Sequence, residues 1–218
     1  MRIRSFFSEA DLAAIRSATE EAEQLTGGEL VCVIVGRCDD YQEASWRGAA
    51  LGALTAVSIA AVSMVTTASW SPWGPAWMIG LVLAGLVLGW ATVTLVPSLA
   101  RYLADPVSLD LRVSRRAAAA FVDEEVFSTV DRTGVLLFIA LFEHRVQILA
   151  DEGVRQRVDE SAWDQVIADL TGGLRSGQRG DAVRQAVVEI GRILATNKVP
   201  RRSEDVDELD NEPRIYDR

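Results

Sequence analysis

The sequence predicts an α/β fold in which one helix-covered sheet is interrupted by a two-helix transmembrane hairpin. Two observations lead to this prediction. Residues 48–100 contain no Asp, Glu, Lys or Arg. Apolar runs of strand length and helices with one apolar face lie on both sides of this window. Because the strand before the window cannot bury itself alone, we expect residues 1–46 and 101–196 to form one split domain around the hairpin, residues 47–100.

The charge outside the window is acidic on balance. The chain has 31 Asp and Glu against 22 Lys and Arg, a net charge of -9. Phosphate binding along a nucleic acid needs clustered Lys and Arg, so this composition argues against nucleic acid as a partner. Cys32 and Cys38 are too few for a disulfide framework. Cys32 lies in an apolar run, and we interpret it as a small buried hydrophobic residue.

The segment before the window predicts a helix followed by a buried strand. Ser8 is a good N-cap residue with Asp11 three positions on, and apolar residues recur at helical spacing to about Thr26. The two glycines that follow are typical of a helix end. The run ELVCVIVG, residues 29–36, has the length of a strand, and its nearly continuous apolarity indicates burial on both faces. After it, RCDDYQEASW predicts a turn and a helix that continues into the window.

The window itself predicts two transmembrane helices, residues 48–68 and 77–99. The first would be about 31 Å long, enough for a hydrocarbon core of about 30 Å. Within the second, Trp77 to Val96 is already long enough, and Pro97 is available to end the helix there. Between them, SWSPWGPAW supplies turn formers and interfacial tryptophans. Small residues four positions apart permit close helix packing, and these are Gly48 with Gly52 and Gly85 with Gly89. The alternative is a helical hairpin buried in a large soluble core.

The flanking charges predict the orientation of the hairpin. Arg47 precedes the first span, and Arg101, Arg112, Arg115 and Arg116 follow the second, whereas the connecting loop has no charge. The positive-inside rule then places both ends in the cytoplasm. The opening MRIRSFFSEADLAAIR lacks the apolar stretch of a secretory signal, which agrees with that orientation. We therefore expect an integral protein of the inner or plasma membrane with cytoplasmic N- and C-terminal parts. Because neither span contains an ionisable residue, the hairpin is interpreted as an anchor.

The segment after the window predicts the rest of the sheet and its covering helices. A helix is expected within residues 105–128, with Ala118, Phe121, Val122, Val126 and Phe127 as its apolar residues. Two strands, residues 134–142 and 145–150, are joined tightly at Glu143 and His144. Two amphipathic helices follow, the first capped by Ser161 and the second over residues 179–195. The tail, residues 197–218, is polar and acidic, which predicts an extended or disordered segment.

Several segments resemble the TPM-domain family, which is sometimes labelled TPM phosphatase. They are TGGELVCVIVG, DRTGVLLFIALFEHRVQILADEGV and AWDQVIADLTGGLRSGQRGDAVRQAVVEIGRIL, within residues 5–37 and 117–196. The resemblance implies an α/β/α sandwich with a small mixed sheet. Members of the family include a thylakoid factor with reported acid phosphatase activity and an accessory protein of a neurotransmitter receptor, and some members bind calcium. Many members carry a signal peptide, whereas this chain has an internal hairpin instead.

Acidic residues at strand ends are the candidate metal ligands. Asp39 follows the first strand, Asp131 precedes the second, and Asp151 follows the third. Ligands of open α/β sheets gather outside the carboxyl ends of the strands, and clustered carboxylates suit Ca²⁺ or Mg²⁺. The alternative is that these are solvated loop acids in an acidic protein. The single histidine, His144, is interpreted as an exposed turn residue.

The sequence lacks two signatures of covalent phosphatases, Cys-x5-Arg and Asp-x-Asp-x-Thr/Val. We therefore expect a membrane-anchored cytoplasmic module that interacts with other membrane proteins, or with a second copy of itself, as an accessory factor. The alternative is a weak metal-dependent acid phosphatase that uses Asp39, Asp131 and Asp151. A transporter or channel component is disfavoured, because the spans are uncharged.

Overall fold

The computed structural model describes residues 6–66, 74–197, 199 and 208–217. The chain divides into two compact units: an α/β unit, residues 1–38 and 110–218, and a hairpin unit, residues 39–109. The α/β unit therefore draws its elements from both sides of the apolar window.

The α/β unit is a mixed α/β fold with a small mixed sheet, which confirms the predicted class. Its elements in chain order are α1 (Glu9–Leu25), β1 (Glu29–Val35), α5 (Pro106–Asp123), the short 3-10 helix η2 (Val126–Ser128), β2 (Gly134–Ala140), β3 (Arg145–Ala150), α6 (Glu152–Arg155), η3 (Glu160–Trp163), α7 (Asp164–Ser176), α8 (Arg179–Thr196) and β4 (Arg214–Tyr216). The first residues of α5 belong to the hairpin unit.

The sheet has the strand order β3-β2-β1-β4. β1 is parallel to both of its neighbours, and β3 is antiparallel to β2 because a tight turn joins them. Every residue of β1 and β2 is buried. Burial on both faces explains why these two strands are apolar at nearly every position, as the sequence predicted.

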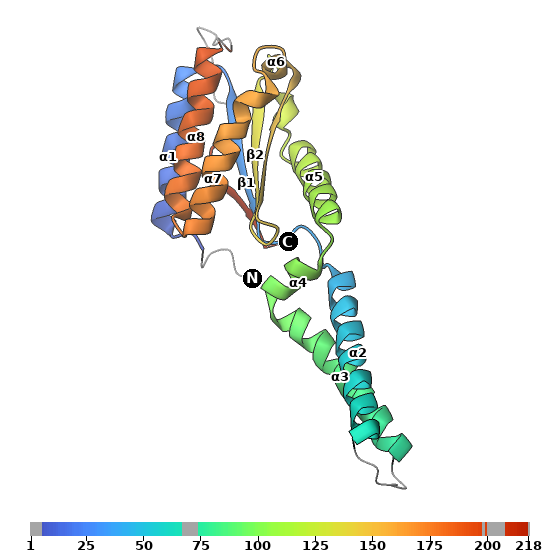
Figure 1. Cartoon of the computed structure of the whole chain (residues 1–218). Helices are drawn as coiled ribbons and strands as arrows, with labels where there is room; N and C mark the ends of the chain where they lie inside the picture. Colours follow the sequence, from blue (N-terminus) through green and yellow to red (C-terminus); the bar gives the residue numbers. More distant parts are fainter. Residues whose placement is uncertain (1–5, 67–73, 198, 200–207, 218) are drawn as a thin grey trace. The chain divides into compact units, whose positions relative to one another are not determined.

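Helices cover both faces of the sheet, so the α/β unit has three layers (Figure 1). Helices α1, α7 and α8 pack on one face against alternate strand residues such as Leu30, Cys32 and Leu137. On the other face, α5 and η2 pack against Val31, Val33, Phe138 and their neighbours. Because side chains alternate along a strand, β1 contributes to both layers.

Local sequence signals explain where the helices begin and which face they bury. Ser8 and Asp11 form the reciprocal capping box that begins α1. The buried face of α5 differs from the predicted one: Val113 and Ala117 are buried, whereas Val122 is 58% exposed. Asp159, and not Ser161, caps the segment before α7, because its side chain accepts the Ser161 N–H.

The C-terminal tail corrects one prediction, because residues 214–216 form β4 and extend the sheet beside β1. Arg214 explains this order: its Nε lies 3.0 Å from a Glu124 carboxylate oxygen, and both side chains are largely buried. The Tyr216 hydroxyl also donates to Glu124. The remaining residues of the tail between 200 and 207 lie outside the described part of the chain.

The hairpin unit consists of α2 (Gln42–Thr66), α3 (Gly74–Leu95) and α4 (Pro97–Leu103). The helix after β1 runs on into the first apolar span, and Pro97 ends α3, both as predicted. The loop tryptophans Trp70 and Trp73 lie outside the described residues.

Glycines bring α2 and α3 into backbone contact. A Cβ added at Gly52 would lie 2.1 Å from the Gly85 carbonyl oxygen, and one at Gly89 would lie 2.2 Å from that of Gly48. Only a residue without a Cβ permits this approach, so the predicted small-residue pairs do form the contact.

Both long helices are long and apolar enough to cross a membrane. Their most apolar 18-residue windows are only 22% buried in α2 and 6% buried in α3. A core helix of a soluble protein would be mostly buried, so these two helices do not have the environment of a core element.

We predict that the α/β unit folds without the hairpin. Replacing residues 42–103 with a short Gly/Ser linker should give a soluble domain that unfolds cooperatively, because the replaced residues contribute no strand. Residues 1–46 alone should be unfolded, since β1 then has no neighbouring strand and little apolar surface is buried. Circular dichroism and limited proteolysis check both expectations. A protease-resistant 1–46 fragment, or a linker variant without cooperative unfolding, would contradict the prediction.

We also predict that Gly52→Leu separates α2 from α3. The Ser45 and Thr94 hydroxyls are 3.3 Å apart, so cysteines at these two positions should form a disulfide in a Cys38→Ser background. Gly52→Leu should reduce the yield of that disulfide, because its side chain has no room. Gly80→Leu is the matched control, since a Cβ there meets no atom within 4 Å. Equal disulfide yields in the two variants would refute the glycine contact.

Candidate functional site

The three predicted metal ligands do not lie at one edge of the sheet. Asp131 precedes β2 and Asp151 follows β3, and these strands are antiparallel, so both residues lie at the amino end of β2. Asp39 follows β1, and the residue before it, Cys38, donates its N–H to Glu143 at the opposite end of β2. The part of the chain that the structure describes contains no group of three His, Cys, Asp or Glu side chains that could hold a metal. Cation binding at any one of these residues stays a prediction.

Asp151 has a structural role that the sequence analysis did not assign. Its side chain is 5% exposed, and Oδ1 accepts the Glu152 N–H at 2.7 Å to cap α6. The Arg132 guanidinium approaches both oxygens, with Nη2 3.0 Å from Oδ1 and Nε 2.7 Å from Oδ2. This carboxylate is therefore already used by the protein. Asp39 and Asp131 are exposed.

The interpretations of Cys32 and His144 are confirmed. Cys32 is 3% exposed, and burial raises the pKa of its thiol to about 12, which keeps it protonated and unreactive at neutral pH. His144 is exposed at the turn between β2 and β3, where its backbone has a φ of 53°.

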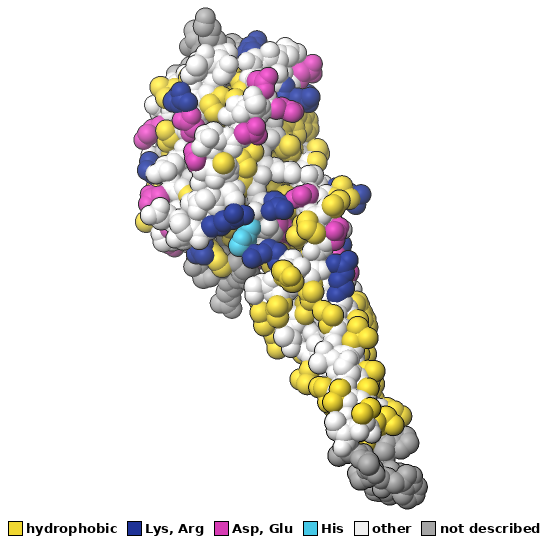
Figure 2. All heavy atoms as spheres, in the orientation of Figure 1, with side chains coloured by type: hydrophobic (Ala, Val, Ile, Leu, Met, Phe, Trp, Pro, Cys, Tyr) yellow, Lys and Arg dark blue, Asp and Glu magenta, His cyan; other side chains and the backbone are white. Residues whose placement is uncertain are grey.

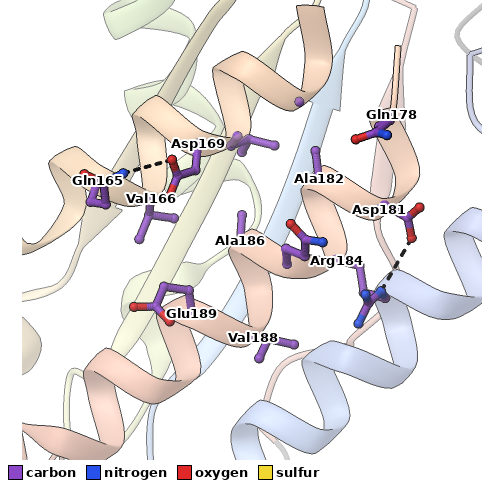
Figure 3. A pocket seen from close by; sticks show the side chains of 13 residues that line it. Gln165, Val166, Asp169, Gln178, Asp181, Ala182, Arg184, Ala186, Val188 and Glu189 are labelled. Atoms are coloured by element: carbon purple, nitrogen blue, oxygen red, sulfur yellow. Dashed lines mark hydrogen bonds and ion pairs between the residues drawn. The ribbon is translucent and has the colours of Figure 1, made fainter. Parts of the chain in front are cut away.

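A groove of about 380 Å³ lies between α7 and α8 (Figure 3). Its floor contains Val166, Leu170, Ala182 and Ala186, and Gly173 lets the two helices approach closely, because a Cβ there would lie 2.4 Å from that of Ala182.

The carboxylates of this groove all have polar neighbours. Asp169 accepts a hydrogen bond from Gln165 at 2.8 Å, Asp181 lies 3.8 Å from Arg184, and Glu189 pairs with Arg192. Small apolar side chains on the floor and satisfied charges at the rim suit contact with a protein surface.

A second pocket, of about 200 Å³, lies at the carboxyl end of β2. We call it the carboxyl-end pocket. Its lining comes from four segments: Phe6 before α1; Ala140, Leu141 and His144 at the end of β2; Thr171, Leu174 and Arg175 in α7; and Arg179 at the start of α8. Figure 2 shows the single histidine with dark blue Lys or Arg side chains beside it.

Sequence reasoning missed this pocket apart from His144. Arg175 and Arg179 stand on either side of Gly177, whose φ of 88° ends α7 and turns the chain into α8. The segment LRSGQRG carries that turn signal, but nothing in it indicates that Phe6 comes from the far end of the chain to join the two arginines.

We predict that Asp151→Asn destabilises the protein, whereas Asp131→Asn does not. Asp151 is buried against Arg132, so neutralising it removes a charged hydrogen-bonding partner of that guanidinium, a loss of about 1–3 kcal/mol, while Asn still serves as the N-cap of α6. Asp131 is exposed, and its substitution should change stability by less than about 0.5 kcal/mol. Denaturant unfolding of both variants in mild detergent measures the difference.

The same experiment is repeated with added Ca²⁺ or Mg²⁺. Equal effects of the two substitutions would contradict the structural role of Asp151. A cation-dependent gain in stability that either substitution removes would instead support the predicted metal site.

Comparison with known proteins gives one family match and one similar structure. Residues 93–193 match the model of the TPM domain family, a segment that begins in α3 and ends in α8. No curated protein sequence matches the chain. The NMR structure of the BA42 protein from the psychrophilic bacterium Bizionia argentinensis is similar, with a TM-score of 0.58, 17% sequence identity, and coverage of 98% of each chain. At this identity the likeness shows the fold alone, and the family match shows that residues 93–193 are similar to the TPM domain.

Proposed function

We propose that the chain is an integral membrane member of the TPM-domain family. In this proposal, the hairpin unit anchors the α/β unit at the cytoplasmic face, where it serves as an interaction or accessory module for other membrane proteins. The exposed apolar surface of α2 and α3 is the observation on which the proposal rests.

The side chains of these helices explain why a bilayer is the expected environment. Large apolar residues are at least half exposed along both helices, among them Leu51, Leu54, Val57, Ile59, Val62, Met64, Val65, Ile79, Leu83, Val87, Leu88 and Leu95. Apolar surface in water costs about 25 cal/mol per Å², and monomeric soluble proteins rarely expose continuous patches of this kind. A hydrocarbon core removes that cost, and helices satisfy the backbone hydrogen bonds within it.

Residues at one end of the hairpin unit are of the types found at the boundary between membrane and water. Arg47 donates from Nη1 to the Leu103 carbonyl oxygen at 2.6 Å, which links the start of α2 to the end of α4. Trp46 is 64% exposed and Tyr102 is 84% exposed. Amphipathic aromatic and cationic side chains gather at the membrane–water boundary, and the cations favour the cytoplasmic side.

An accessory role fits the contacts within both units. The close contact at Gly52 and Gly85 holds α2 directly against α3. Such packing suits an anchor more than a pathway for ions. In the α/β unit, the groove between α7 and α8 offers an apolar floor and paired charges to a protein partner.

We predict that this groove contacts another integral membrane protein or a second copy of the chain. A photo-crosslinking residue at Val188, which lines the groove and is 46% exposed, should give one reproducible adduct in native membranes. The matched control is Val122, which is 58% exposed on α5. Mass spectrometry of the adducts identifies the partner. No adduct at Val188, or the same adducts at both positions, would contradict the proposed contact.

The membrane anchor and the alternative enzyme are tested separately. A cysteine at position 71 should react with an impermeant reagent in intact cells, whereas one at position 217 should react only after permeabilisation. Reaction at position 217 in intact cells would contradict the orientation. Phosphoester hydrolysis at about 1 per second or faster that needs a divalent cation and Asp131 would favour the phosphatase over the accessory module.

A further inference from the structure

The carboxyl-end pocket combines a cavity with unpaired positive charge. Arg175 and Arg179 line it together with His144, and none of its lining residues is acidic. Within the described residues, neither guanidinium makes a side-chain hydrogen bond or an ion pair. Most other arginines of the α/β unit have such a partner, as Arg16, Arg132, Arg145, Arg192 and Arg214 show.

Two arginines without an ion pair are unusual in a protein with an excess of acidic residues. The chain has 31 acidic residues against 22 Lys and Arg, so two neighbouring arginines that make no ion pair are unexpected. Two acids lie near the start of α8: Asp181 in its first turn, which pairs with Arg184, and Asp11, whose Oδ1 would lie 2.1 Å from a Cβ added at Gly180. The Asp11 carboxylate already accepts hydrogen bonds from the backbone and side chain of Ser8.

The neighbouring groups hold the pocket in a form suited to an anion. The Arg179 guanidinium stacks over the Phe6 ring at 4.6 Å from its centroid, and Phe6 packs against the core, so this cation is positioned before a ligand arrives. No side chain caps the start of α8, where the positive end of the helix dipole adds to the charge of Arg179. The Thr171 hydroxyl provides a neutral donor in the same lining.

The size of the pocket limits the ligand. Its volume of about 200 Å³ is several times the roughly 30 Å³ that a water molecule occupies in the liquid, which is enough for a phosphoryl group and part of its substituent. Leu141 and Leu174 add apolar wall next to the two cations. Guanidinium groups bind phosphate oxygens through paired N–H donors, so two arginines in one small cavity favour this class of anion.

We propose that the carboxyl-end pocket binds a phosphoryl group through Arg175 and Arg179, without hydrolysing it. The group belongs either to the headgroup of a phospholipid or to a soluble phosphate ester, and the chemistry of recognition is the same for both. This inference does not depend on the proposed protein partner of the groove between α7 and α8.

Binding is tested with the full chain in mild detergent, by native mass spectrometry and thermal denaturation. The probes are inorganic phosphate, glycerol phosphate and dioctanoyl phosphatidic acid, with dioctanoylglycerol as the uncharged lipid control. We expect at least one phosphoryl probe to bind and to raise the denaturation temperature, and dioctanoylglycerol to do neither. Binding of phosphatidic acid alone identifies a lipid headgroup, and binding of the soluble probes identifies a phosphate ester.

Variants assign the binding to the pocket. Arg175→Gln and Arg179→Gln together should weaken binding of the phosphoryl probe at least tenfold. The matched control, Arg115→Gln with Arg155→Gln, removes the same charge from exposed arginines elsewhere and should leave binding within twofold. Arg175→Gln alone keeps the Arg179–Phe6 contact, so it separates lost binding from lost folding. Failure of every phosphoryl probe to bind the unchanged protein, or equal loss in the control, would overturn the proposal.

Discussion

The pairing of β1 with β2 is the contact on which the rest of the α/β unit depends. The two strands are parallel over seven positions, from Glu29 with Gly134 to Val35 with Ala140. Every residue of both strands is buried. β1 supplies alternate side chains to the two apolar clusters, so α1 and α8 on one face and α5 on the other all pack on a surface that this pairing creates. The family match covers residues 93–193, which include β2 and β3, so the sheet is complete only with β1 and β4 from outside that segment.

The two ends of a segment inserted between β1 and β2 must lie close enough together for the two strands to remain paired. The hairpin unit meets this requirement through its own contacts. Glycines hold α2 against α3, and Arg47 binds the carbonyl of Leu103, so the beginning and the end of the unit are linked by hydrogen bonding. The cost of closing a loop grows only slowly with its length, and it is smaller still when the loop is folded. A long apolar segment is therefore compatible with one continuous sheet.

Local patterns in the sequence correctly predicted the elements whose signals come from residues close together in the chain. The continuous apolarity of β1 and β2, the capping box at Ser8 and the stop at Pro97 each depend on neighbours close in the chain. β4 was not predicted, because three residues carry no period and its order comes from Glu124, ninety positions away from Arg214.

The candidate sites were harder to predict for the same reason. Asp131 precedes β2 and Asp39 follows β1, and because the two strands are parallel, these residues lie beyond opposite ends of the strands. The strand boundaries alone do not reveal this, since it depends on the direction in which the strands pair. Nor does local sequence show that Phe6 stacks on Arg179, because this contact joins residues that are far apart in the chain. Charge near a turn was visible in LRSGQRG, but its convergence with a cavity needed the fold.

The strand order also constrains how the protein is made. Of the four strands of the sheet, β1 is synthesised first, yet both strands that flank it are encoded later, and β4 is the last of the four. At roughly 5–20 residues per second, the approximately one hundred residues between β1 and β2 take on the order of 5–20 s to synthesise. During that interval, β1 is a nearly continuous apolar segment that has no neighbouring strand to pair with, so it is exposed to aggregation or capture by chaperones. The hairpin unit is synthesised in the same interval, so its two long apolar helices also leave the ribosome before the domain can fold.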